Sequence, residues 1–174
     1  MRFYTHVLFA LFFYFLAIII FNLNFSIFFA LILCLGAILP DIDSPNSFIN
    51  RKIKISKLVI VFSKHRGFFH SLFGILFFFI IGFMITLFIG LSLIYTAFFC
   101  FGYFLHLVAD SMTISGVRWF WLSKKGHLQG KIKTGSIFEN LLFVTLLILT
   151  ICLFIKLPEF QKIIAFISKI KIKP

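Results

Sequence analysis

This sequence has few acidic residues and no closely spaced cysteines. Only five of its 174 residues are aspartate or glutamate, against seventeen lysines and arginines, so the formal net charge is +12. Three cysteines lie singly inside apolar runs, and none has a partner at CxxC spacing. This pattern excludes a disulfide framework and a thiolate metal site.

Apolar residues make up 61% of the chain, and its mean hydropathy is +1.12. A soluble domain has roughly 45–50% apolar residues, so this excess predicts an integral membrane protein with lipid as the solvent. The positive charge is then best explained by lysine and arginine retained on cytoplasmic loops beside anionic lipid. Membrane lipid is therefore an expected partner, and nucleic acid is not.

Long apolar runs predict about five membrane segments, each near the short end of the roughly 17–25 residues that span a bilayer. The predicted segments are residues 3–21, 25–39, 70–89, 91–109 and 138–155. The tail, residues 156–174, is lysine-rich and amphipathic, and we expect it along the membrane surface. The predicted fold is an all-α polytopic transmembrane bundle that forms one integral membrane domain over residues 1–174.

Loop charge predicts the orientation. Residues 40–66 and 110–136 carry eleven of the seventeen positive charges, so both loops and the N-terminus should be cytoplasmic. Five crossings would then place the tail outside, although it carries five lysines. Either the tail is exported despite its charge, or the fifth segment does not fully cross.

Ionisable groups are expensive at membrane depth, so each needs a specific reason. His106 and Asp110 lie four residues apart near the end of the fourth segment, a spacing that places both on one helix face. From there an imidazole and a carboxylate can share a metal ion. The alternative is a polar pair that satisfies itself at a helix end.

Asp41 and Asp43 follow Pro40 in a segment expected to be extended, where residues two apart point to one side. They can present two carboxylates to one centre, or else cap a turn. His70 falls in the first turn of the third segment. Arg66 precedes it, at a helix N-terminus suited to an anionic oxygen, and His65 either ligates a metal or extends the basic loop.

His6 opens the first segment, where a histidine is either a ligand or an interfacial residue. Ser136 and Glu139 match a capping box at the start of the fifth segment, and Glu139 could otherwise act as a general base or a ligand. The predicted topology brings these groups to the cytoplasmic ends of the helices. The predicted metal ligands are His6, Asp41, Asp43, His65, His70, His106 and Asp110, and the predicted catalytic residues are Arg66 and Glu139.

Several of these motifs recur together in a way that resembles the YdjM-type family, which comprises bacterial inner-membrane proteins described as LexA-regulated and as predicted metal-dependent hydrolases. The motifs are Thr5-His6, Pro40-Asp41-Ile42-Asp43, His65-Arg66-Gly67, His70-Ser71, His106-x-x-x-Asp110, Gly116-Val117, and Thr134-Gly135-Ser136 with Glu139. Phe69 and Leu122-Ser123 depart from the family pattern, but neither departure removes a candidate ligand. The resemblance implies a location in the bacterial inner membrane and a hydrolase activity.

Mixed histidine and carboxylate ligands suit zinc, with manganese or iron as alternatives, and seven candidates exceed one tetrahedral shell, so two ions are an option. We therefore expect a membrane-embedded hydrolase that uses metal-activated water at the cytoplasmic interface. Its expected substrate is a phosphoester or a lipid-linked phosphate. The alternatives are an ion or metal transporter, a non-catalytic metal-binding protein, and a structural protein whose polar clusters only hold helices together.

Overall fold

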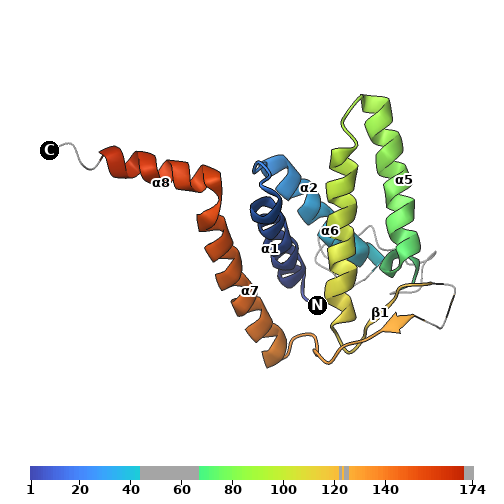
Figure 1. The fold of residues 1–174 in the computed structure, drawn as a ribbon. Helices are drawn as coiled ribbons and strands as arrows, with labels where there is room; N and C mark the ends of the chain where they lie inside the picture. Colours follow the sequence, from blue (N-terminus) through green and yellow to red (C-terminus); the bar gives the residue numbers. More distant parts are fainter. Residues whose placement is uncertain (44–66, 122, 124–125, 171–174) are drawn as a thin grey trace.

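The computed structural model describes residues 1–43, 67–121, 123 and 126–170, and of residues 42–43 and 167–170 it describes the backbone only. These described residues are mainly helical (Figure 1), which confirms the predicted all-α bundle. With η denoting a 3₁₀ helix, the elements are α1 (Phe3–Phe21), α2 (Ile27–Ile38), η1 (Leu39–Asp43), η2 (Phe68–His70), α5 (Leu72–Ile89), α6 (Ile94–Ser111), β1 (Val117–Arg118), β2 (His127–Leu128), α7 (Ile137–Lys156) and α8 (Pro158–Ile170).

Four of the described helices, namely α1, α5, α6 and α7, are long and apolar enough to cross a membrane, with 18 to 20 residues each. At about 1.5 Å per residue they match a hydrocarbon core of about 30 Å. In the spans of α1 and α6, 44% of the residues are buried, against 11% in α5 and 17% in α7. α1 and α6 therefore form the centre of the bundle, and α5 and α7 face lipid.

The second predicted segment, residues 25–39, corresponds to α2, which begins two residues later and ends one residue earlier. α2 has only 12 residues, and the chain then tightens into η1. The change comes at Pro40, which has no N–H to continue the α-helical hydrogen bonds. This tightening matters because η1 carries Asp41 into the polar end of the bundle.

Glycine lets α2 and α6 touch through their backbones. A Cβ atom at Gly102 would overlap the carbonyl oxygen of Leu33, and one at Gly36 would overlap the carbonyl oxygen of Phe99. In a membrane, where lipid is as apolar as leucine, such close approach between small residues is a main source of helix association. The contact fixes how far α2 lies from the histidine-bearing face of α6.

At the end of the bundle away from η1, α8 begins beside the turn between α1 and α2. The carboxylate of Glu159 accepts a hydrogen bond from the backbone N–H of Phe25 (3.1 Å), and Tyr14 Oη donates to the carbonyl of Ser26 (2.9 Å). α7 therefore runs the whole length of the bundle, parallel to α1. α7 is long and apolar enough to cross a membrane, and α8 turns away from it after Leu157 (Figure 1).

We expect Gly102→Ala to destabilise the protein by about 1–3 kcal/mol, because the new methyl group overlaps backbone that cannot rotate away. Thermal unfolding in detergent measures the change. Gly82→Ala is the matched control, since its Cβ would meet only side-chain atoms of Thr96, the nearest at 2.9 Å. Equal losses in the two variants would contradict a backbone contact between α2 and α6.

Candidate metal centre

One end of the bundle collects most of the buried ionisable groups. The N-terminus, the C-terminal end of α6 and the two 3₁₀ helices lie together there (Figure 1). His6, His70, His106 and Asp110 are each at most 2% exposed. Charged or polar groups this deeply buried are normally paired or bound to a metal ion.

His106 and Asp110 lie one turn apart on α6, as their spacing predicted. His106 Nε2 is 4.0 Å from Asp110 Oδ2. His6 reaches the pair from the first turns of α1. Its ring stacks on that of His106, with the ring centroids 3.9 Å apart, and its Nε2 lies 3.3 Å from Asp110 Oδ1.

The two 3₁₀ helices complete the cluster from the other side. His70 Nε2 lies 3.6 Å from Asp41 Oδ1 and 3.9 Å from Asp110 Oδ2, while His106 Nε2 lies 3.8 Å from the same Asp41 oxygen. η2 is held in place locally, because Tyr103 Oη of α6 donates a hydrogen bond to the carbonyl of Phe69 (2.5 Å). Ser71 Oγ closes the turn onto the carbonyl of Phe68 (2.6 Å).

His106 is oriented by the backbone of α2. Its Nδ1 lies 2.7 Å from the carbonyl oxygen of Ala37, to which it can donate, so the lone pair of Nε2 faces the cluster. This is the support that metal-binding histidines usually have. Nε2 of His106 and both ring nitrogens of His6 are buried without a hydrogen-bond partner among the described residues. Unpaired imidazole nitrogens beside two carboxylates fit a divalent transition metal.

The ligand atoms form two overlapping groups. His6, His106 and Asp110 make one, while Asp41, His70 and His106 make the other, and within each group the atoms lie within 4.8 Å of one another. The two oxygens of Asp110 face different sides: Oδ1 faces His6 and Oδ2 faces His70. Because Nε2 of His106 can serve only one ion, these groups would hold one ion, or two ions of which only one takes His106 as a ligand.

A positive charge already faces one of the two carboxylates. The amino group of Met1 donates a hydrogen bond to Asp110 Oδ1. Burial raises the pKa of the Asp41 carboxyl, but the nearby imidazoles of His106 and His70 lower it by more, so this pKa lies well below its usual value. Asp41 therefore stays a carboxylate, the form that binds metal, at every physiological pH.

Other predicted site residues fall outside this description. His65 and Arg66 lie outside the described residues, as does the side chain of Asp43. Their roles as ligands or anion-binding groups stay predictions. Arg118, on β1, and His127, on β2, are exposed.

Glu139 is fully buried, but it holds the N-terminal segment and belongs to neither ligand group. Its carboxylate accepts hydrogen bonds from the backbone N–H groups of Arg2 (2.6 Å) and Gly135 (2.5 Å) and from the hydroxyl of Thr5 (3.3 Å). Ser136 accepts from the Glu139 N–H (3.4 Å), which is one half of the predicted capping box, whereas the Glu139 carboxylate accepts from Gly135 and not from Ser136. Glu139 thereby ties the start of α7 to the residue before His6.

Sequence reasoning missed the groups that orient the ligands. The carbonyl of Ala37 carries no sequence signal, because any residue on α2 has one. Thr5 is different, since its place beside His6 could have marked it as a support. The contact of the Met1 amino group with Asp110 arises only from the path of α1.

The fold and this centre define a polytopic helical membrane protein with buried histidine–aspartate groups that could hold a metal ion. A family model described as YdjM inner membrane protein matches residues 1–169. The chain belongs to this family, which confirms the resemblance seen in its motifs. Searches of curated proteins and of solved structures gave no match.

We expect Glu139→Gln to lower the free energy of unfolding by about 1–3 kcal/mol. The amide NH₂ would face one of the two backbone N–H groups that now donate to the carboxylate, and two donors cannot form a hydrogen bond. Thermal unfolding checks this. Glu159→Gln is the control: its Oε1 accepts from Phe25, its Oε2 has no partner among the described residues, and an amide can keep that single bond. A smaller loss at Glu139 than at Glu159 would contradict the role of Glu139 as a clamp.

Proposed function

We propose that this protein is a membrane-embedded, metal-dependent hydrolase. The observation that carries the proposal is the convergence of His6, His70, His106, Asp41 and Asp110, from four separate elements, with ligand atoms 3.3–4.0 Å apart. Those separations are close to the distances between neighbouring ligands around one small cation. Packing alone gives no reason to bury so many ionisable groups in so apolar a chain.

The residues have distinct tasks in this proposal. His70, His106 and Asp41 hold the metal from one side, and Asp110 reaches toward both ligand groups through its two oxygens. Zinc is the first choice, with manganese or iron as alternatives. When bound, such a metal supplies Lewis acidity, which activates water near neutral pH and offsets negative charge on a phosphoester.

Access to the centre supports a substrate that approaches beside Asp41. Its side chain is 24% exposed, whereas those of the other four are at most 1% exposed. The neighbouring segment, residues 44–66, contains Arg66, which we propose binds an anionic group of the substrate. The location at one end of a membrane bundle favours a phosphoester or lipid-linked phosphate, and the basic loops favour a cytoplasmic orientation.

A non-catalytic metal-binding role is the second candidate, and the near-complete burial of the histidines favours it. A transporter is less well supported, because an ion path needs polar groups through the membrane. The ligand groups of the described residues all lie at one end of the bundle.

Metal analysis of the purified protein tests the centre. We expect one or two divalent metal ions per chain, and we expect His106→Ala and Asp110→Asn to lose about tenfold or more in metal affinity, because each removes a direct ligand. His127→Ala is the matched control, since this histidine is exposed and belongs to neither ligand group. Absence of metal from the wild type, or full retention in both variants, would sink the proposed centre.

Hydrolysis is tested separately. We expect the metal-loaded protein to release phosphate or a phosphorylated headgroup from lipid phosphoesters, and a chelator to abolish the release. Asp41→Asn should reduce the rate by at least tenfold, because it removes the most exposed of the proposed ligands. His127→Ala should leave the rate unchanged. A protein that binds metal but releases nothing from a panel of lipid phosphoesters would favour the non-catalytic role.

A further inference from the structure

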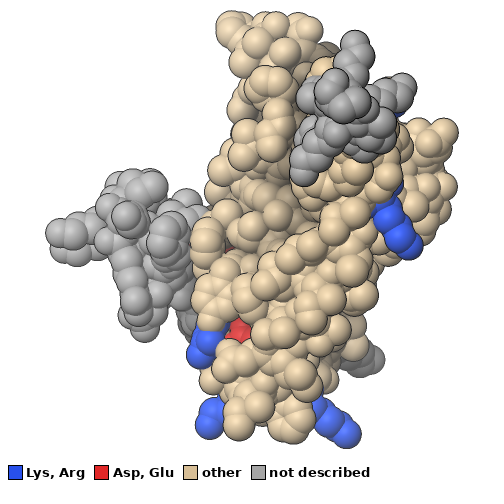
Figure 2. Space-filling model, turned by 90° about the vertical axis from the view of Figure 1, so that its left-hand side faces the viewer, with Lys and Arg blue, Asp and Glu red and all other residues tan. Residues whose placement is uncertain are grey.

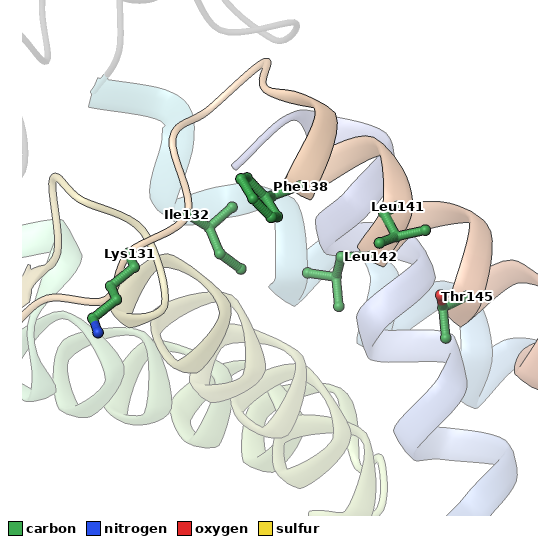
Figure 3. Close-up of a pocket in the computed structure, with 6 residues that line it drawn as sticks. All are labelled: Lys131, Ile132, Phe138, Leu141, Leu142 and Thr145. Atoms are coloured by element: carbon green, nitrogen blue, oxygen red, sulfur yellow. The ribbon is translucent and has the colours of Figure 1, made fainter.

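A groove of about 500 Å³ lies along the first turns of α7, beside the segment that leads into that helix (Figure 3). Its lining residues are Lys131, Ile132, Phe138, Leu141, Leu142 and Thr145. Figure 3 shows them in succession, from Lys131 on the segment before the helix to Thr145 on the helix. Among the described residues that line it, Lys131 is the only charged one, so the groove is an apolar slot with a cation at one end.

The groove lies on a helix that is long and apolar enough to span a membrane. Phe138 is 72% exposed and Leu141 is 62% exposed, although both lie on a helix long and apolar enough to span a membrane. Apolar side chains with that exposure mark a surface that contacts membrane or another protein, and on a candidate membrane span we take the contact to be lipid. An acyl chain from the bilayer therefore matches the walls in chemistry, and the volume lies within the range of small-molecule sites.

Charge specifies the headgroup. Lys131 is exposed and has no ion pair with a described residue, and Lys133 is exposed two residues further on. Figure 2 shows one flank of the bundle, where several lysine or arginine side chains lie toward the lower end and another lies higher up on the right. A lysine at the edge of an apolar span attracts the phosphate of anionic lipids.

Backbone hydrogen bonds connect the groove to the segments that carry the candidate metal ligands. Ile132 donates its N–H to the carbonyl of Met112 (3.2 Å), two residues beyond Asp110. Glu139, next to Phe138, accepts from the N–H of Arg2. A lipid in the groove would therefore have its headgroup at the end of the bundle where the centre lies.

We propose that this groove binds one acyl chain of an anionic membrane phospholipid, with the lipid phosphate held by Lys131. Binding requires neither metal nor hydrolysis, so it stands apart from the proposed function. If the protein both binds lipid here and is the proposed hydrolase, the groove selects lipid substrates by their acyl chain and headgroup.

Native mass spectrometry of the full-length protein in detergent tests the headgroup. We expect one phosphatidylglycerol to bind more tightly than phosphatidylcholine with the same chains. Lys131→Gln should weaken phosphatidylglycerol binding by about fivefold, the effect of one lysine near an anionic headgroup. Lys133→Gln, which removes an equal charge outside the groove, should have little effect. Equal binding of the two lipids, or equal losses in the two variants, overturns the role of Lys131.

A second pair of variants tests the groove itself. Thr145→Trp fills its far end and should abolish tight lipid binding, whereas Val144→Trp adds the same ring one residue away, at a position that does not line the groove. Thermal unfolding confirms that both variants fold. Retention of lipid by Thr145→Trp overturns the proposal.

Three further outcomes separate the alternatives. Loss of lipid on chelation would show that the metal, not the groove, holds it, and would overturn the proposal. Displacement by glycerol phosphate, which has no acyl chain, would do the same. A change from dimer to monomer in Thr145→Trp, with lipid binding intact, would make the groove a subunit contact instead. Metal content and hydrolysis are measured in parallel, so a failed groove and a failed hydrolase give different results.

Discussion

Mutual contact among buried ionisable groups is the constraint on which the rest of this structure depends. Lipid cannot solvate imidazole or carboxylate, so such groups must find partners inside the bundle. His6, His106 and Asp110 do so across two helices, and Asp41 and His70 join them from two 3₁₀ helices. The geometry that satisfies these groups is also one that a divalent metal ion requires, which links the stability of this end of the bundle to its proposed chemistry.

Two features of the apolar part of the chain place the ligands. Glycine at the crossing of α2 and α6 brings their backbones into contact, and the carbonyl of Ala37 on α2 can then orient His106. On the other side of the centre, Glu139 ties the start of α7 to Arg2 and Thr5. The lipid-facing helix is thus connected to the ligands through one carboxylate, and the groove on that helix lies close to the centre.

Much of the fold was predictable. The apolar runs predicted the long helices within a few residues, and the family followed from motifs spread along the chain. The second segment, predicted as residues 25–39, is α2 (Ile27–Ile38), but hydropathy did not reveal that the chain continues past Pro40 as a 3₁₀ helix. For Glu139 the sequence left two roles open, helix capping or catalysis. The structure shows a further role, a hydrogen-bonded contact with the N-terminal segment, which no local sequence pattern predicts.

The sequence by itself determined that this is a helical membrane protein, and that His106 and Asp110 share a helix face, because apolar length and i, i+4 spacing are local properties. Only the tertiary structure decided which other groups meet them. Whether His6 and His70 reach Asp110, and on which of its oxygens, depends on helix crossings tens of residues apart. Those crossings are set by the close approach of glycines to backbone carbonyls of the facing helix and by a hydrogen bond to a main-chain carbonyl, which are properties of the packed bundle.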